Sequence, residues 1–218
     1  MKAYVIGIDY GTDSARAVLI DAMTGGQVAS SSMNYPRWAK GLYCDPSIQQ
    51  FRQHPLDYVE CLEHILRIVV AECPDPSAIK AIAVDTTAST PCFCDENAVP
   101  LSMKPGFEDD PDAMFILWKD HTGTEEADYI TTKCRQHEPD YTCLSGGNYS
   151  PENFWSKVLH TVRKSEKVRN EAYGLIEECD FIPAVLTGCR SHKDLKPGHC
   201  VASVKQFWLC GCSIFCMG

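Results

Sequence analysis

The sequence lacks long apolar runs, internal repeats and low-complexity tracts. None of its 218 residues lies in a stretch that approaches the ~18 apolar residues needed to cross a bilayer, which excludes a membrane-spanning helix. The apolar run after Met1-Lys2 covers only residues 3–8 and is too short for a secretion signal. We therefore expect a soluble, cytoplasmic protein with no membrane partner.

Basic residues are also fewer than acidic residues. Lys and Arg number 20 against 29 Asp and Glu, which gives a formal charge of -9. This balance argues against a nucleic-acid partner, because such a surface needs a basic stripe. A local site for a phosphorylated ligand stays open, since a ligand responds to its own site rather than to the sum of charges. The hydrophobic fraction of 44% allows a sizeable core.

Cysteine, by contrast, is abundant. The thirteen cysteines run from Cys44 to Cys216. Because no export signal precedes them and the cytosol is reducing, we expect free thiols. Cys92 and Cys94, like Cys210 and Cys212, are separated by one residue rather than by the two of a zinc knuckle. Buried thiols are therefore favoured over metal ligands.

The first part of the chain predicts three strands joined by short turns. Residues 3–9, 15–21 and 27–33 are the strands, with polar turns at 10–14 and 23–26 between them. Two short turns between three strands indicate an antiparallel meander. Residues 34–54 show no periodicity and predict a long loop that carries aromatic and charged side chains, a kind of loop that is often functional.

Helices and strands then alternate. Pro55 is a favoured first helical residue, and apolar residues recur at helical spacing from Leu56 to Val69. The apolar run 79–85 predicts a strand buried on both faces. The remaining predicted elements are a hairpin of 92–95 with 99–101, a strand at 115–118, a helix at 126–134 with a Thr122–Glu125 capping box, a helix that starts at Ser150-Pro151-Glu152, a strand at 175–176 and a helix at 180–186. This order predicts an α/β domain.

The turn after the first strand, Asp9-Tyr10-Gly11-Thr12-Asp13-Ser14, has the chemistry of a phosphate site. Gly11 permits a sharp turn and leaves space for a bulky group. Backbone amides of such a turn can converge on an anion, and the hydroxyls of Thr12 and Ser14 add donors. Asp9 can hold magnesium directly or through water. An ordinary hairpin turn capped by Asp9 is the alternative, because short motifs often occur by chance.

Two further segments are candidates for a polyol site. Asp85-Thr86-Thr87-Ala88-Ser89-Thr90-Pro91 places small hydroxylic residues at the carboxyl end of a strand, where ligands of open α/β sheets bind. Trp118-Lys119-Asp120-His121 offers a ring that can stack on a sugar and groups that can bond its hydroxyls. A solvated loop is the alternative for the first segment, and a helix entrance capped by Asp120 or Thr122 for the second.

These motifs, taken together, resemble the FGGY family of carbohydrate kinases. They follow the order of that family over about residues 3–208, and the segments around Tyr35-Pro36-Arg37-Trp38 and Trp118-Lys119-Asp120-His121 resemble specifically its members that phosphorylate ribulose. The strings that carry the resemblance are 7–17, 35–38, 41–45, 50–58, 84–91, 111–122 and 179–188.

The resemblance implies a fold, two cofactors and a set of site residues. The fold is a ribonuclease H-like domain of the actin and hexokinase type, with residues 1–208 forming the amino-terminal, sugar-binding domain of two. ATP and Mg²⁺ are the implied cofactors. Asp9, Gly11, Thr12 and Ser14 would face the ATP phosphates and magnesium, with Asp9 on the metal, and Thr87, Ala88, Ser89, Trp118, Lys119, Asp120 and Lys205 would bind the sugar.

The activity implied by the resemblance is ATP-dependent phosphorylation of ribulose, as in L-arabinose catabolism. Family members are roughly twice this length, so the resemblance places the general-base aspartate and the carboxyl-terminal nucleotide domain beyond residue 218. We therefore expect weak or no activity from this chain alone. Another pentulose or polyol kinase, or a non-catalytic sugar-binding module, is the alternative, and a homo-oligomer is left open.

The sequence departs from the family in three places. Residues 146–155 differ from the string that the family usually carries there, with Pro151 and Asn153 in place of a serine and a tryptophan. The surroundings of Lys205, Ser203-Val204-Lys205-Gln206-Phe207-Trp208, lack the histidines that the family carries there. Residues 209–218 resemble nothing in the family and hold three of the thirteen cysteines. A shifted reading frame would produce such a tail, and sequencing the gene across the codons for 200–218 tests that hypothesis.

Overall fold

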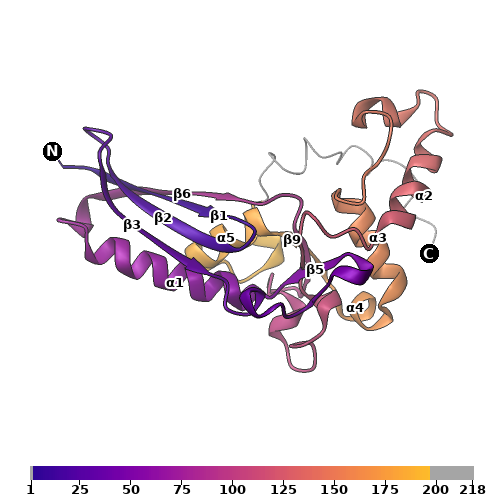
Figure 1. Cartoon of the computed structure of the whole chain (residues 1–218), viewed down its shortest axis with the longest axis horizontal. Helices are drawn as coiled ribbons and strands as arrows, with labels where there is room; N and C mark the ends of the chain where they lie inside the picture. Colours follow the sequence, from indigo (N-terminus) through magenta and orange to yellow (C-terminus); the bar gives the residue numbers. More distant parts are fainter. Residues whose placement is uncertain (1, 197–218) are drawn as a thin grey trace.

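A four-stranded sheet forms one half of the molecule (Figure 1). In the computed structural model, which describes residues 2–196, β1 (Tyr4–Tyr10), β2 (Ser14–Asp21) and β3 (Gln27–Asn34) pair antiparallel in sequence. β6 (Ile79–Thr86) joins the other side of β1 in parallel, which gives the order β3-β2-β1-β6. The predicted meander followed by a parallel strand is therefore confirmed.

One face of this sheet is covered by helix α1 (Pro55–Ala71) (Figure 1). Alternate β1 side chains, from Tyr4 to Tyr10, point into the core because the side chains of a strand alternate between its two faces. The helix starts as predicted at Pro55, where the His54 imidazole accepts a hydrogen bond from the backbone N–H of Leu56 at 3.1 Å. The buried stripe of α1 consists of Tyr58, Cys61, Leu62, Ile65 and Val69.

The opposite face of the sheet, which we call the outer face, is more open. In-register neighbours on this face include Gly7 of β1, Val18 of β2 and Ala83 of β6. The prediction that β6 is buried on both faces is wrong, since its residues are exposed or half-buried and Ile82 is 42% exposed. β6 lies at the edge of the sheet in the described part of the chain, so it has only β1 beside it.

Residues 34–54 contain more regular structure than the predicted loop. β4 (Cys44–Asp45), β5 (Gln50–Gln53) and β8 (Phe115–Ile116) form a small sheet in the order β4-β5-β8. The predicted strand at 115–118 is thus shortened to two residues. Arg37 fastens the start of this segment to α1, with 2.8 Å from its guanidinium to Asp57 and 2.9 Å to Glu60.

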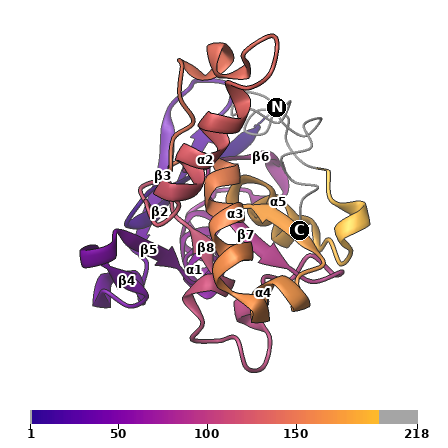
Figure 2. The ribbon, with the colours of Figure 1, turned by 90° about the vertical axis from the view of Figure 1, so that its right-hand side faces the viewer.

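The second half of the chain forms a strand pair and a group of helices (Figure 2). β7 (Pro91–Cys94) pairs antiparallel with β9 (Gly174–Glu177), which confirms the short strand predicted at 175–176. The predicted hairpin of 92–95 with 99–101 is reduced to a turn with a single bridge, Cys94 to Pro100, because β7 takes its partner from β9. The helices are α2 (Thr124–Cys134), α3 (Phe154–Lys164), α4 (Glu166–Glu171) and α5 (Glu178–Thr187). Short 3-10 turns lie at 38–40, 46–48, 76–78, 101–103, 111–113, 141–145 and 192–194.

Two predicted helix starts differ from the structure. The Thr122–Glu125 capping box does not form, because α2 is capped at Gly123 without a side chain and the Thr122 hydroxyl donates to Asp120 instead. The signal at Ser150 produces a turn, and α3 begins only at Phe154. α5 confirms its prediction: it starts two residues early, ends at Thr187 and is capped by Gly188 in the left-handed conformation that favours glycine.

The nine cysteines within residues 2–196 are all free thiols, of which five are buried, three are half-buried and one, Cys143, is exposed. Within the same residues, no helix is long and apolar enough to cross a membrane.

Candidate functional site

The turn between β1 and β2 is fixed from several sides. The Gly11 N–H donates to the Ser14 carbonyl at 3.0 Å and closes the turn. The Tyr35 hydroxyl donates to the Gly11 carbonyl at 3.0 Å, and the Gln53 amide donates to the Thr12 carbonyl at 2.7 Å. Gly11 is not in the left-handed region, and an added Cβ would lie 3.4 Å from the Ser14 carbonyl oxygen. Its value to the turn is therefore space rather than conformational freedom.

A buried group of tyrosines supports this turn from the core side. The rings of Tyr10 and Tyr35 meet that of Tyr58 edge-on, with centroids 5.7 and 5.4 Å apart. The Tyr58 hydroxyl donates to the Gln53 side chain at 2.6 Å, and Gln53 in turn donates to the Thr12 carbonyl. Burial raises the pKa of all three phenols, so they remain hydrogen-bond donors.

Two tryptophans from distant segments bond neighbouring residues of the turn. The Trp38 indole N–H donates to the Asp13 carboxylate at 2.6 Å. The Trp118 indole N–H donates to the Thr12 hydroxyl at 3.1 Å. The structure thus brings together the predicted phosphate turn and the predicted sugar segment that contains Trp118.

Asp9 lies at the end of β1 on the outer face. Its carboxylate is half exposed and pairs with the Arg16 guanidinium at 3.1 Å. The sheet register places Asp85 of β6 directly beside it, and both line a cavity of about 310 Å³ together with Gly7, Arg16, Val18 and Ala83. One or two carboxylates with room for phosphate oxygens and waters form a donor set that suits Mg²⁺. Asp9 and Asp85 therefore fit the implied metal.

The hydroxylic segment after β6 begins next to the turn. The Thr87 N–H donates to the Tyr10 carbonyl at 3.1 Å, so Thr87 and Gly11 follow neighbouring strand ends. Thr87 and Ala88 are half-buried, whereas Ser89 is fully buried. The buried Lys157 ammonium donates to the Ser89 carbonyl at 2.6 Å, so this bond connects the segment to helix α3.

Glu178, which the sequence did not single out, lies beneath this segment. It is fully buried, and its carboxyl accepts a hydrogen bond from the Thr87 hydroxyl at 2.8 Å. Burial raises the pKa of Glu178 well above its usual value, the bond from Thr87 lowers it in part and the charge of Glu177 raises it further. The acidic pair Glu177-Glu178 at a strand-to-helix junction was the available signal.

The other two predicted sugar ligands next to Trp118 have partners of their own. The Lys119 ammonium lies over the rings of Trp38 and Phe51, 4.9 and 4.6 Å from their centroids. Asp120 is fully buried, pairs with the Arg52 guanidinium at 2.9 Å and accepts from the Phe51 N–H at 2.8 Å. His121, half-buried, contacts Glu152 at 3.1 Å. Both Lys119 and Asp120 hold their segment to β5.

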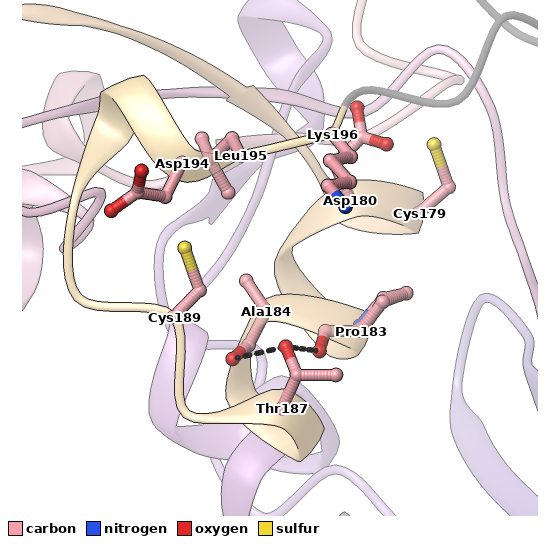
Figure 3. Close-up of a pocket in the computed structure, with 9 residues that line it drawn as sticks. All are labelled: Cys179, Asp180, Pro183, Ala184, Thr187, Cys189, Asp194, Leu195 and Lys196. Atoms are coloured by element: carbon pink, nitrogen blue, oxygen red, sulfur yellow. Dashed lines mark hydrogen bonds between the residues drawn. The ribbon is translucent and has the colours of Figure 1, made fainter.

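Lys205, predicted to bind the sugar, and Trp208 lie outside the described residues. A cavity of about 420 Å³ lies between α5 and residues 189–196. Figure 3 shows residues that line it, among them Thr187, whose hydroxyl donates to the carbonyls of Pro183 and Ala184. The predicted site residues do not line this cavity.

Comparison with known proteins identifies relatives by sequence. No family model matches the chain. It is 43% identical over 210 residues to a ribulokinase of Vibrio parahaemolyticus and 32% identical over 217 residues to one of Shouchella clausii, with 95% of this chain covered in each case. The chain belongs with the ribulokinases. It spans 37% of the length of these two relatives, so it corresponds to part of a ribulokinase sequence.

Solved structures support the fold. A xylulose kinase from Rhodospirillum rubrum superposes with a TM-score of 0.66 at 14% identity, over 93% of this chain and 40% of that one. A glycerol kinase from Plasmodium falciparum, solved with ADP, superposes with a TM-score of 0.65 at 14% identity, over 94% of this chain and 41% of that one. These likenesses confirm the predicted actin and hexokinase type of α/β domain for this ribulokinase relative.

Proposed function

We propose that this chain is the sugar-binding part of an enzyme that transfers a phosphoryl group from ATP to ribulose. The observation that carries the proposal is the bond between the Trp118 indole and the Thr12 hydroxyl at 3.1 Å. It joins a turn with the chemistry of a phosphate site to an exposed aromatic ring with the chemistry of a sugar site. The Thr87 N–H, bonded to the Tyr10 carbonyl, brings the third motif to the same place. The names of the relatives support ribulose as the acceptor.

In this proposal the turn stabilises charge on the transferring phosphoryl group. Phosphoryl transfer depends on positioning and on neutralising negative charge, so fixed N–H and O–H donors lower its barrier. The hydroxyls of Thr12 and Ser14 supply such donors, Gly11 closes the turn through its N–H, and the tyrosines beneath the turn hold it in place. Mg²⁺, held by Asp9 with Asp85 beside it, would neutralise phosphate charge.

The sugar in this proposal binds next to the turn. The ring of Trp118, 36% exposed, offers a flat face for stacking, and Thr87, Ala88 and Ser89 lie at the end of the neighbouring strand. Lys119 and Asp120 position Trp118 rather than touch the sugar, because their charged groups are engaged with β5 and its neighbours. Lys205 stays a predicted sugar ligand.

In this proposal two domains have different roles in the reaction. Residues 1–208 would form the sugar-binding domain, and the general-base aspartate and the adenine site would lie in sequence that the longer ribulokinases have and this chain does not span. Half a cleft does not exclude water or align an in-line attack. We therefore expect this chain alone to bind ribulose and to transfer phosphate slowly or not at all.

Titration calorimetry of the chain with L-ribulose, D-xylulose and glycerol tests the sugar, and a coupled ADP-release assay tests turnover. We expect ribulose to bind the wild type with a measurable heat, which the Trp118→Ala variant should lose. The Trp155→Ala variant, which changes a control tryptophan in α3, should retain it. Binding of xylulose or glycerol in preference to ribulose would favour another kinase of the family. Binding without turnover, even after the missing part of a ribulokinase is supplied, would favour a non-catalytic sugar-binding module.

A further inference from the structure

The bond between Trp118 and Thr12 joins residues that are 106 positions apart. Trp118 follows the buried Leu117, whose N–H donates to the Phe51 carbonyl at 3.1 Å, and precedes the fully buried Asp120. The backbone on both sides of Trp118 is therefore anchored, while its ring remains partly open to solvent. An indole held in this way has a defined direction for its N–H.

The chemistry of the two groups determines where the Thr12 proton goes. An indole N–H can only donate, whereas a hydroxyl has one proton to donate and two lone pairs that accept. Because Trp118 occupies a lone pair of Thr12, the hydroxyl proton is left for another acceptor. Among the residues that the structure describes, no acceptor takes that proton.

The rest of the turn is fixed independently of this bond. The Thr12 carbonyl accepts from Gln53, and the Asp13 carboxylate accepts from Trp38. The Thr12 backbone thus stays in place without Trp118, and what the indole controls is the orientation of a single hydroxyl.

We infer that Trp118 is a positioning residue for the phosphate side of the site, and that its bond to Thr12 makes sugar and nucleotide binding cooperative. The inference rests on the proposed function. A sugar stacked on Trp118 would restrict the motion of the indole, and the indole would then direct the Thr12 proton at a phosphate oxygen. The nucleotide would bind more tightly because less conformational entropy is lost when it binds. By linkage, the nucleotide would strengthen sugar binding by the same factor.

The test follows the backbone amide signal of Gly11 and the indole N–H signals by NMR while the full chain is titrated with Mg·ATP, with and without saturating L-ribulose. In the wild type we expect ribulose to tighten Mg·ATP binding severalfold and both ligands to shift the Trp118 indole signal. Thr12→Val and Trp118→Phe should each weaken Mg·ATP by about tenfold, as expected for one hydrogen bond to a charged group. The double variant should be no weaker than either single variant, because both remove the same interaction.

Two control variants keep the result interpretable. Trp38→Phe removes an indole bond to Asp13 but leaves the bond of Trp118 to Thr12, so it should retain the cooperativity. Thr12→Ser keeps the hydroxyl and should restore both affinity and cooperativity, which separates this role from a general effect on folding. Additive losses with cooperativity intact would overturn the inference and leave the proposed function standing. If neither ligand shifts any signal of the wild type, the proposed function itself fails, and the inference fails with it.

Discussion

At the scale of single residues, Asp9 is the group with the most specific expectation. Asp9→Asn should weaken the binding of Mg·ATP at least tenfold, because an amide is a poor ligand for magnesium. The melting temperature should change little, since the carboxylate is half exposed and its ion pair with Arg16 is worth about 0–1 kcal/mol. Calorimetry and thermal melts measure both quantities.

Arg16→Gln is the matched control for Asp9. It breaks the same ion pair and leaves the carboxylate, so it should retain the affinity for Mg·ATP. A large loss of stability in Asp9→Asn with unchanged nucleotide affinity would instead support a carboxylate that only caps the hairpin turn.

Glu178 makes the stability of the protein depend on pH. Burial raises its pKa in the folded state above the usual 4.5, so the folded state holds a proton that the unfolded state loses as the pH rises. Its contribution is present in full below pH 4.5 and is lost as the pH rises from there towards the raised pKa of the folded state. Glu178→Gln should flatten this decline in urea unfolding measured across that range, whereas the exposed Glu171→Gln should not alter it.

The sequence predicted the exposed members of the candidate site better than the buried ones. Thr12 and Trp118 belong to motifs whose chemistry is visible in the residue types, and the structure joins them. Glu178 and Lys157 were not predicted as site residues, because a charged residue in a helical pattern normally indicates a face exposed to water. Their importance depends on which face of the helix is buried, and tertiary packing decides that.

At the scale of elements, the pairing of β5 with the segment after β8 depends on a buried ion pair. The guanidinium of Arg52 and the carboxylate of Asp120 are both fully buried, 2.9 Å apart. Asp120→Asn should destabilise the fold by about 3–5 kcal/mol, because the buried Arg52 charge then keeps only the more distant Asp112 carboxylate, at 3.8 Å. Urea unfolding measures this loss.

The half-exposed pair of His121 and Glu152 provides the control for Asp120. Glu152→Gln should cost about 0–1 kcal/mol, since water screens that pair. A stable Asp120→Asn variant that loses affinity for ribulose would show that Asp120 is a sugar ligand, as the sequence predicts.

Helices and strands with a repeating pattern of apolar residues could be predicted from the sequence. Short strands that exist only because a distant segment pairs with them could not. The meander and α1 carry repeating apolar patterns over seven or more residues, which local sequence records. β4, β5 and β8 have only two to four residues each and exist because β5 pairs on both sides. The capping signals at Thr122 and Ser150 misled because their hydroxyls take part in turns before the helices begin.

At the scale of the whole molecule, the outer face of the four-stranded sheet predicts self-association. Val5 and Val18 are half-buried on this face, and Ala81 and Ala83 of the edge strand β6 are exposed, so apolar surface reaches solvent there. We expect the apparent mass in light scattering to rise with protein concentration. Val18→Asp should suppress the rise, whereas Met23→Asp, which adds the same charge in an exposed hairpin turn, should not. A constant mass for the wild type at high concentration would contradict this expectation.

The order of predicted strands and helices along the sequence predicted the architecture of the domain. It did not predict that β6 is exposed to solvent. A continuous apolar run is typical of a strand with neighbours on both sides. Over the residues described, β6 has a neighbour on one side only. The apolar run at 79–85 therefore predicted a burial that the described residues do not show.

The interlocked tyrosines beneath the turn also give the folded state a spectroscopic signature. Tyr10, Tyr35 and Tyr58 resist ionisation because burial raises their pKa, whereas unfolding would return them to ordinary phenols. In an alkaline absorbance titration these three should form phenolate only when the polypeptide denatures, in one abrupt step and with hysteresis on back-titration. Loss of that step in a variant would report, without any ligand, that the support under the turn has loosened.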